Sequence, residues 1–292
     1  MTPNAPTLRH HIEATLLKWA IALFRLIPVD AASWAMGKLW RLFAPLNPRH
    51  KRALGHLEMA LPETTEAERQ KILSEMWENL GRVAAETFFI RELVNDPTRF
   101  ELDMDETAQK VLDGKTNTVL VSMHSGNWEL CVQPTFVDGV PIAGIYQALK
   151  NPLADDVLSS MRRDLYPLGL LSKGYETARK IIGLVRGGGT IAIMGDLREN
   201  RGVTVNFFGQ EATATPVPAT LARTNNVPLI AGRVIRTKGA RFRIEARVVE
   251  ITQTDDKKHD IQQLTQKTHE IFEGWIRERP GQWMWIIRKW RK

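Results

Sequence analysis

Only one cysteine, Cys131, occurs in the 292 residues of the sequence. No disulfide can therefore form within the chain, which excludes a secreted domain built on disulfides and favours a reducing compartment. Internal repeats and low-complexity segments are also missing. A hydrophobic share of 43% and a mean hydropathy of −0.25 exclude a polytopic membrane protein and a disordered chain. The sequence thus predicts a folded, mostly soluble protein.

Acidic residues are fewer than basic ones. The chain has 40 Lys and Arg against 33 Asp and Glu, for a formal net charge of +7. This balance predicts an anionic partner such as nucleic acid, anionic lipid or an acidic carrier protein. Nucleic acid is not indicated, because the sequence has no helix-turn-helix, RNA-binding or zinc-finger signature. The histidines and the cysteine also lack the spacing of a metal site, so we expect no metal.

The tryptophans gather near the two ends of the sequence, each time beside Lys and Arg. Seven of the nine tryptophans lie there, namely Trp19, Trp34 and Trp40 near the N-terminus and Trp275, Trp283, Trp285 and Trp290 near the C-terminus. Aromatic rings next to cations are typical of side chains at a membrane–water boundary. The alternative is that these tryptophans belong to the core of a basic protein.

Residues 8–27 are typical of an amphipathic helix, with Lys18 and Arg25 on its polar face. The longest charge-free stretch in this segment is far shorter than the roughly 20 apolar residues of a spanning helix. We therefore expect the helix to lie in a membrane interface, with a short tilted span as the alternative. A cleaved signal peptide is not indicated, because charges interrupt the apolar region.

Two regions differ in their periodicity. Residues 1–95 are predicted to be helical, whereas short β-rich runs alternate with helical ones over residues 96–292. The expected strands are 118–123, 142–146, 190–194, 229–234 and 242–249, and the expected helices between or after them are 128–135, 153–165, 177–186, 217–225 and 261–277. This alternation predicts an α/β core with a central mixed sheet flanked by helices, and catalytic groups in loops after strand ends.

The first such loop contains the pattern H-x-x-x-x-E, from His124 to Glu129. If a helix begins near Ser125, Glu129 can bond to one imidazole nitrogen and leave the other as a proton acceptor. The first N–H groups of that helix would face a developing oxyanion. The alternative is a structural histidine at a strand end.

Other blocks in the chain point to a family. The string HSGNWE resembles the motif of bacterial lipid A late acyltransferases, within the wider H-x-x-x-x-D/E signature of glycerolipid acyltransferases. Further resemblances are YQALKNP at 146–152, Gly195-Asp196, FFG at 207–209 with ATP at 214–216, and PGQWMW at 280–285 with RKW at 288–290. The likeness covers nearly the whole chain and is weakest before residue 50.

The resemblance implies acyl transfer to a hydroxyl of a lipid A precursor, at the cytoplasmic face of the bacterial inner membrane. The donor it implies is acyl carrier protein, whose phosphopantetheine thioester is a co-substrate, with acyl-coenzyme A as the less favoured alternative; no further cofactor is expected. Expected partners are therefore the carrier protein, the lipid A precursor and the anionic membrane surface.

The same resemblance suggests roles for individual residues. His124 is the expected general base, oriented by Glu129, and Asn127 and Asp196 are expected to stabilise the oxyanion or position substrate. The expected substrate-binding residues are Tyr146, Lys150, Asn151, Arg163, Arg198 and Thr215.

This chain departs from the family pattern in two places. It has Gln147-Ala148 where the family has Arg-Pro, and Leu197 where it has Gln. A lost guanidinium changes phosphate binding, although other arginines, namely Arg162, Arg163, Arg198 and Arg201, are candidates to replace it. Another glycolipid, a lysophospholipid or an aminolipid therefore stays open as acceptor, as does a non-catalytic basic membrane-binding protein.

Two nucleophiles lie near His124, but neither has the setting of a covalent catalyst. No G-x-S-x-G elbow surrounds Ser125, and Cys131 lies between apolar residues. We therefore predict direct transfer without an acyl-enzyme.

Overall fold

The computed structural model describes residues 6–250 and 253–290. The α-helices are α1 (Leu8–Phe24), α2 (Val29–Phe43), α3 (Arg49–Ala60), α4 (Glu66–Thr87), α5 (Ile90–Val94), α6 (Glu106–Leu112), α7 (Gln133–Val137), α8 (Pro152–Arg162), α9 (Tyr175–Arg186), α10 (Val217–Asn225) and α11 (Lys257–Glu278). Short 3₁₀ turns are η1 (Ala44–Leu46), η2 (Pro97–Arg99), η3 (Trp128–Leu130), η4 (Arg163–Leu165) and η5 (Pro280–Gln282).

A mixed sheet of seven strands forms the centre of the described chain, in the order β1-β9-β8-β2-β5-β3-β4. Its strands are β1 (Phe100–Met104), β2 (Val119–Ser122), β3 (Ile142–Tyr146), β4 (Gly169–Ser172), β5 (Thr190–Met194), β8 (Leu229–Lys238) and β9 (Arg241–Val248). All neighbouring pairs are parallel except β8 and β9. The strands β6 (Arg198–Phe207) and β7 (Gln210–Ala214) form a separate antiparallel hairpin.

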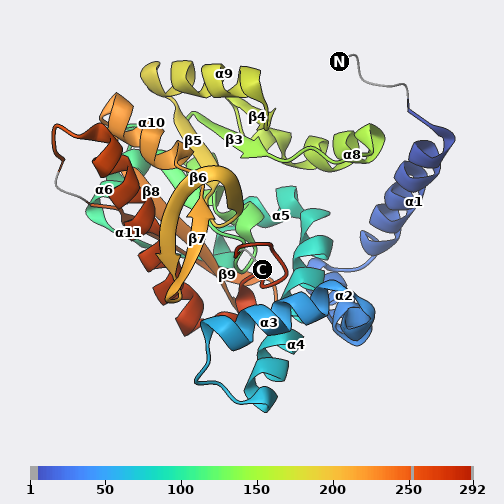
Figure 1. Ribbon diagram of the computed structural model, residues 1–292. Helices are drawn as coiled ribbons and strands as arrows, with labels where there is room; N and C mark the ends of the chain where they lie inside the picture. The colour runs from blue at the N-terminus through green and yellow to red at the C-terminus, as the bar shows by residue number, and fades with distance from the viewer. Residues whose placement is uncertain (1–5, 251–252, 291–292) are drawn as a thin grey trace.

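The sheet is covered on both faces, as the run of fully buried residues in β2 requires. Val119 and Val121 point to the cluster that includes α9, α10, α11 and the C-terminal residues. Leu120, which alternates with them, points to the cluster that includes α5 and α6. The architecture is thus the expected α/β fold with a central mixed sheet flanked by helices (Figure 1).

The helices α1 to α5 occupy residues 8–94, and the first strand begins at Phe100. The predicted boundary near residue 95 therefore falls between the last of these helices and the sheet. Buried residues on both sides of it pack together, since α3 and α4 share one cluster with β2 and β5, and α5 shares the other with β8 and β9.

The helix α1 lies apart from the other N-terminal helices and runs beside α8 (Figure 1). Its N-terminus is stabilised by a capping box between Thr7 and His10. Many large apolar side chains of this region are exposed, namely Leu8, Ile12, Leu16, Trp19, Leu23, Leu26, Ile27, Trp34, Leu39, Trp40, Leu42, Phe43 and Leu46. Within the described residues, none of the helices combines the length and hydropathy that crossing a bilayer demands.

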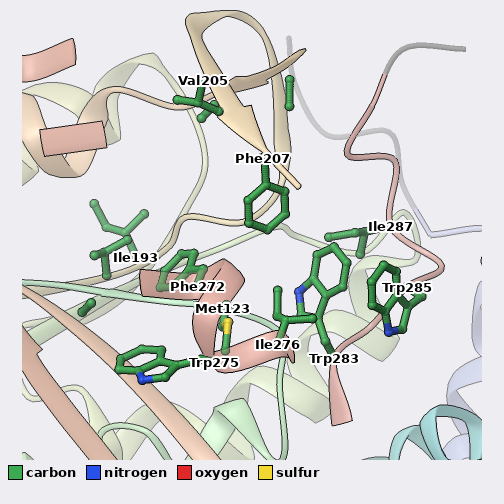
Figure 2. Close-up of a cluster of buried hydrophobic side chains, with 14 of the residues drawn as sticks. Met123, Ile193, Val205, Phe207, Phe272, Trp275, Ile276, Trp283, Trp285 and Ile287 are labelled. Carbon is green, nitrogen blue, oxygen red and sulfur yellow. The ribbon is translucent and has the colours of Figure 1, made fainter. Parts of the chain in front are cut away.

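The tryptophans behave differently at the two ends of the chain. Trp19 is 71% exposed, whereas Trp283 is completely buried. Trp275, Trp285 and Trp290 are also buried. Figure 2 shows Trp283 and Trp285 in a cluster with Phe207, Phe272 and Met123. A membrane-facing role for the C-terminal tryptophans is therefore wrong, because their rings fill the core.

Most expected elements are present, but the helix expected over residues 128–135 is wrong. The chain there forms the single turn η3 and then the five-residue α7, because Pro134 lacks an N–H group and favours a new helix start. The strands β1 and β4 and the β6–β7 hairpin were not expected.

Candidate active site

The site lies where two adjacent parallel strands end. Ser122 of β2 is paired with Met194 of β5. His124 follows Ser122 by two residues, and Asp196 follows Met194 by two residues. Because the pair is in register, both side chains are placed at the carboxyl edge of the sheet, where α/β proteins bind their ligands.

His124 and Asp196 are joined by two hydrogen bonds. The imidazole Nδ1 lies 2.7 Å from Oδ1 of Asp196, and the backbone N–H of His124 donates to Oδ2 over 2.8 Å. The indole Nε1 of Trp283 also donates to Oδ2, over 2.9 Å. With its proton on Nδ1, the ring presents Nε2 as an acceptor, and Nε2 has no hydrogen-bond partner among the described residues. The side chain of His124 is 14% exposed, so the ring is partly open to solvent.

The two groups shift each other's pKa. Burial alone would lower the pKa of His124, but the charge and hydrogen bond of Asp196, with the charge of Glu129, raise it above 6.5. Burial would likewise raise the pKa of Asp196, yet the charge of His124 and the hydrogen bonds from His124 and Trp283 lower it to about 2. Asp196 is therefore a carboxylate at neutral pH and stabilises a protonated imidazole.

The loop after His124 is fixed by backbone contacts from distant parts of the chain. The N–H of Gly126 donates to the carbonyl of Gln282 over 3.1 Å, and that of Met284 donates to the carbonyl of His124 over 3.0 Å. The Asn79 side chain of α4 donates to the carbonyl of Gly126 over 2.8 Å. The loop thus depends on both α4 and the C-terminal residues.

Asn127 is buried and points away from His124, into a polar cluster. Its Nδ2 donates to Oε2 of Glu86 over 2.8 Å. Glu86 is itself fully buried and also binds Ser33 and Arg236. One donor of the Asn127 amide is thus bound to a carboxylate rather than free for an oxyanion, and the expected oxyanion role stays a prediction.

Three backbone N–H groups at the corner where an oxyanion site was expected are also occupied. Those of His124, Ser125 and Gly126 donate to Asp196, Met123 and Gln282 respectively. No helix begins at Ser125, which forms an isolated bridge to Trp283. The interpretation of this corner as a helix N-terminus is therefore wrong.

Glu129 does not bind His124; the carboxylate on the imidazole is that of Asp196. Glu129 accepts instead from Nη1 of Arg162 over 2.6 Å, and both side chains are largely buried. It still lies near enough to raise the pKa of His124 by its charge. The predicted Glu129–His124 hydrogen bond is wrong because the guanidinium of α8 competes for the carboxylate.

Arg162 connects this ion pair to Tyr146. The guanidinium lies over the Tyr146 ring, 5.7 Å from its centroid. The Tyr146 hydroxyl donates to Oδ2 of Asp155 over 2.9 Å. The Nε of Arg162 is buried without a hydrogen-bond partner in the described chain. Tyr146 therefore lies beside the Arg162–Glu129 ion pair, and one donor of Arg162 is buried without a partner.

The side chain of Asn151 holds two helices together. Its Oδ1 caps α8 by accepting from the N–H groups of Leu153 and Ala154. Its Nδ2 donates to the carbonyl of His10 and to Glu13, each over 3.0 Å. Asn151 thus joins α8 to α1, and its amide is already fully used.

The remaining expected substrate-binding residues do not contact the His124–Asp196 pair. Lys150 is exposed, and Arg163 is exposed beside Asp156. Arg198 begins β6 and donates to Asn200 over 2.8 Å. Thr215 accepts from the N–H of Val217, the first residue of α10, over 3.3 Å.

The two candidate nucleophiles are buried. Ser125 is part of the bridge to Trp283. Burial raises the pKa of the Cys131 thiol to about 11, despite a hydrogen bond with Ser122. At neutral pH Cys131 is therefore a thiol rather than a nucleophilic thiolate.

Sequence reasoning missed how Asp196, Trp283 and Arg162 act. His124 and Asp196 each lie two residues after the end of their strand, β2 and β5. This equal spacing indicates that the two side chains meet, but only if β2 and β5 are known to be neighbours in the sheet. Trp283 lies 87 positions from Asp196 and Arg162 lies 33 from Glu129, so no local pattern connects these pairs.

Comparisons with known proteins show the family to which the chain belongs. Residues 1–292 match the family model for bacterial lipid A biosynthesis acyltransferases. A lipid A biosynthesis myristoyltransferase of Escherichia coli (strain K12) is 24% identical over 280 residues, which cover 92% of this chain and 84% of that protein. Family and relative together indicate an acyltransferase of lipid A synthesis. The chain belongs to the bacterial lipid A biosynthesis acyltransferase family.

Proposed function

We propose that this protein transfers a fatty acyl group from acyl carrier protein to a hydroxyl of a lipid A precursor, with His124 as general base. The 2.7 Å contact between Nδ1 of His124 and Asp196 supports this most directly. It fixes the tautomer in which Nε2 accepts a proton. Asp196, rather than Glu129, is the carboxylate that orients the base.

In the proposed step, Nε2 removes the proton of the acceptor hydroxyl while its oxygen attacks the carbonyl carbon of the thioester. The carbon–sulfur bond then breaks, the ester forms, and the leaving thiolate takes the proton from the imidazolium. Asp196 stabilises that imidazolium in between. A general base of this kind contributes about a hundred- to ten-thousandfold in rate. The buried Ser125 and Cys131 favour direct transfer without an acyl-enzyme.

Glu129 takes part through Arg162 in this proposal. Its carboxylate holds the guanidinium near the site, and its charge favours the protonated form of His124. The Arg162 side chain is 16% exposed, so the open part of its guanidinium is a donor for an anionic part of the substrates. Arg162 is thus the guanidinium that we propose in place of the one missing at Gln147.

We also propose that the protein works at the cytoplasmic face of the bacterial inner membrane. The exposed apolar side chains of α1 and α2 support this, because they would lie in the interface without crossing it. The net charge of +7 favours both anionic lipid and an acidic carrier protein.

The test is an assay with purified protein, acyl-loaded carrier protein and a defined lipid A precursor, with the product identified by mass spectrometry. His124→Ala is expected to lower kcat by about a hundredfold or more. Ser125→Ala and Cys131→Ser are the matched controls and should keep substantial activity.

Three outcomes would contradict parts of the proposal. An acyl group trapped on Ser125 or Cys131 would exclude direct transfer. Transfer only from acyl-coenzyme A would exclude the proposed donor. Transfer to a lysophospholipid or aminolipid but not to the lipid A precursor would exclude the proposed acceptor.

A further inference from the structure

A second buried basic group lies behind the site. The Lys289 side chain is completely buried. Its Nζ lies 2.7 Å from Nε2 of His269 on α11, and 5.2 Å from the centroid of the Phe207 ring. A buried lysine is costly unless it is paired. Neither Phe207 nor a neutral imidazole carries a compensating charge.

His269 is held in the tautomer that accepts from Lys289. Its Nδ1 lies 2.8 Å from the carbonyl of Thr265, which can only accept, so the ring proton is on Nδ1. Nε2 is then a lone-pair acceptor facing the lysine. Burial and the charge of Lys289 lower the pKa of His269 to about 3, so the imidazole stays neutral. The proton between the two groups therefore belongs to Lys289.

No carboxylate of the described residues forms an ion pair with Lys289, and Asp196 is the buried carboxylate whose charge raises the pKa of Lys289. Phe207 contacts both Lys289 and Trp283, the residue whose indole donates to Asp196. Figure 2 shows Phe207 and Trp283 in the cluster beside Met123, which precedes His124. Burial lowers the pKa of Lys289 to about 8, while the charge of Asp196 opposes that fall.

The other groups around this region do not supply that balance. Glu129 acts on His124 but is paired with Arg162. His56 of α3 contacts the Trp290 ring, and its Nδ1 lies 2.9 Å from the carbonyl of Trp285. Asp196 is thus the carboxylate through which both His124 and Lys289 are coupled.

We propose that Lys289 is a positioning residue for the His124–Asp196 pair, whose buried ammonium keeps His124 neutral and able to accept a proton near pH 7. When Lys289 is charged, its positive charge cancels the negative charge of Asp196. A neutral His124 then leaves this buried group of residues with no net charge. Without it, a neutral His124 would leave the carboxylate uncompensated, and the imidazole would take up a proton instead. This proposal rests on the proposed role of His124 as a base.

The test is an NMR titration of His124 in the wild-type chain, Lys289→Met and Lys289→Arg, with the His124 signal assigned from its loss in His124→Ala. Met keeps the volume without the charge, and Arg keeps the charge. The His124 pKa should rise by about one unit in Lys289→Met and stay near the wild-type value in Lys289→Arg. An unchanged value in the methionine variant, or an equal rise in both, would overturn the proposal.

The charge interaction between Asp196 and Lys289 affects the pKa of each residue equally. Asp196→Asn therefore gives a second measurement, which does not depend on whether Lys289→Met folds. The pKa of Lys289, followed by lysine-selective labelling, should fall further below 8 in Asp196→Asn. An unchanged value would overturn the proposal.

Neither titration needs a substrate, so failure of this proposal is separable from failure of the proposed reaction. If the protein does transfer acyl groups, the acid limb of the kcat–pH profile should move to higher pH in Lys289→Met. The rate should fall several-fold at pH 7, recover at alkaline pH, and be restored by Lys289→Arg. A fall that is the same at all pH values would indicate a packing defect and contradict the proposal.

Discussion

At the scale of single residues, the site is an imidazole whose proton affinity is set by its neighbours. Asp196 raises the pKa of His124 above 6.5 in spite of burial. A general base must be unprotonated to act, so activity should rise with pH and reach half its plateau above pH 6.5.

Asp196→Asn should move this midpoint in the opposite direction. The variant removes the charge and the carboxylate acceptor that favour the imidazolium, so burial dominates and the His124 pKa falls. The acid limb should then lie below its wild-type position, with a lower plateau because the tautomer is less well fixed. The kcat measured from pH 5 to 9 gives both quantities. A midpoint that stays in place would mean that another group titrates.

Gly126 illustrates a residue whose type is dictated by the backbone. Its φ is +57°, and a Cβ there would lie 2.0 Å from the carbonyl oxygen of Val234. Gly126→Ala should therefore lower the free energy of unfolding by about 2 kcal/mol or more and displace His124. Chemical denaturation and kcat measure the two effects. Gly139→Ala is the matched control, because its φ is +66° but its Cβ would meet nothing within 4 Å. An equal loss in both variants would assign the effect to φ alone.

The sequence predicted the place of His124 after a buried strand but not its hydrogen-bond partner, for a physical reason. A histidine directly after a buried strand is visible in any local pattern. The partner depends on which carboxylate reaches it. Glu129 is five positions away but is held by Arg162, whereas Asp196 reaches Nδ1 because β5 lies beside β2.

At the scale of elements, Asn151 joins two helices and offers a test of how α1 is held. Asn151→Ala removes the cap of α8 and the contact with α1, and should cost about 0.5–2 kcal/mol. Asn151→Asp keeps an acceptor for the cap but has no donor for His10 and repels Glu13.

Hydrogen exchange should therefore distinguish the two variants. In Asn151→Asp, amides of α1 should exchange faster while those of α8 stay protected; in Asn151→Ala, both helices should exchange faster. Unchanged exchange in α1 would show that its apolar contacts with α8 suffice to hold it.

Elements with strong local patterns were predicted closely, and those that depend on partners were not. The strands 142–146 and 190–194 and the helix 217–225 have the predicted bounds. The β6–β7 hairpin alternates weakly and is held by distant contacts, such as that of the Gln266 side chain of α11 with the backbone of Asn206. The edge strand β1 has few buried side chains, so its pattern is weak as well.

At the scale of the whole molecule, exposed apolar side chains are concentrated on α1, α2 and the segments after them. If this surface meets a bilayer, Trp19→Ser with Leu23→Ser should weaken sedimentation with anionic liposomes by about tenfold. Leu102→Ser is the matched control, because Leu102 is 51% exposed on β1. Equal binding by all three proteins would place the membrane contact elsewhere.

The C-terminal residues complete a site whose other parts lie far earlier in the chain. Trp283 and Met284 bind Asp196 and the carbonyl of His124, and Lys289 lies behind them. During synthesis, β2 and β5 leave the ribosome long before these residues do. The nascent chain therefore cannot complete the hydrogen bonds around His124 and Asp196 until translation has passed Met284.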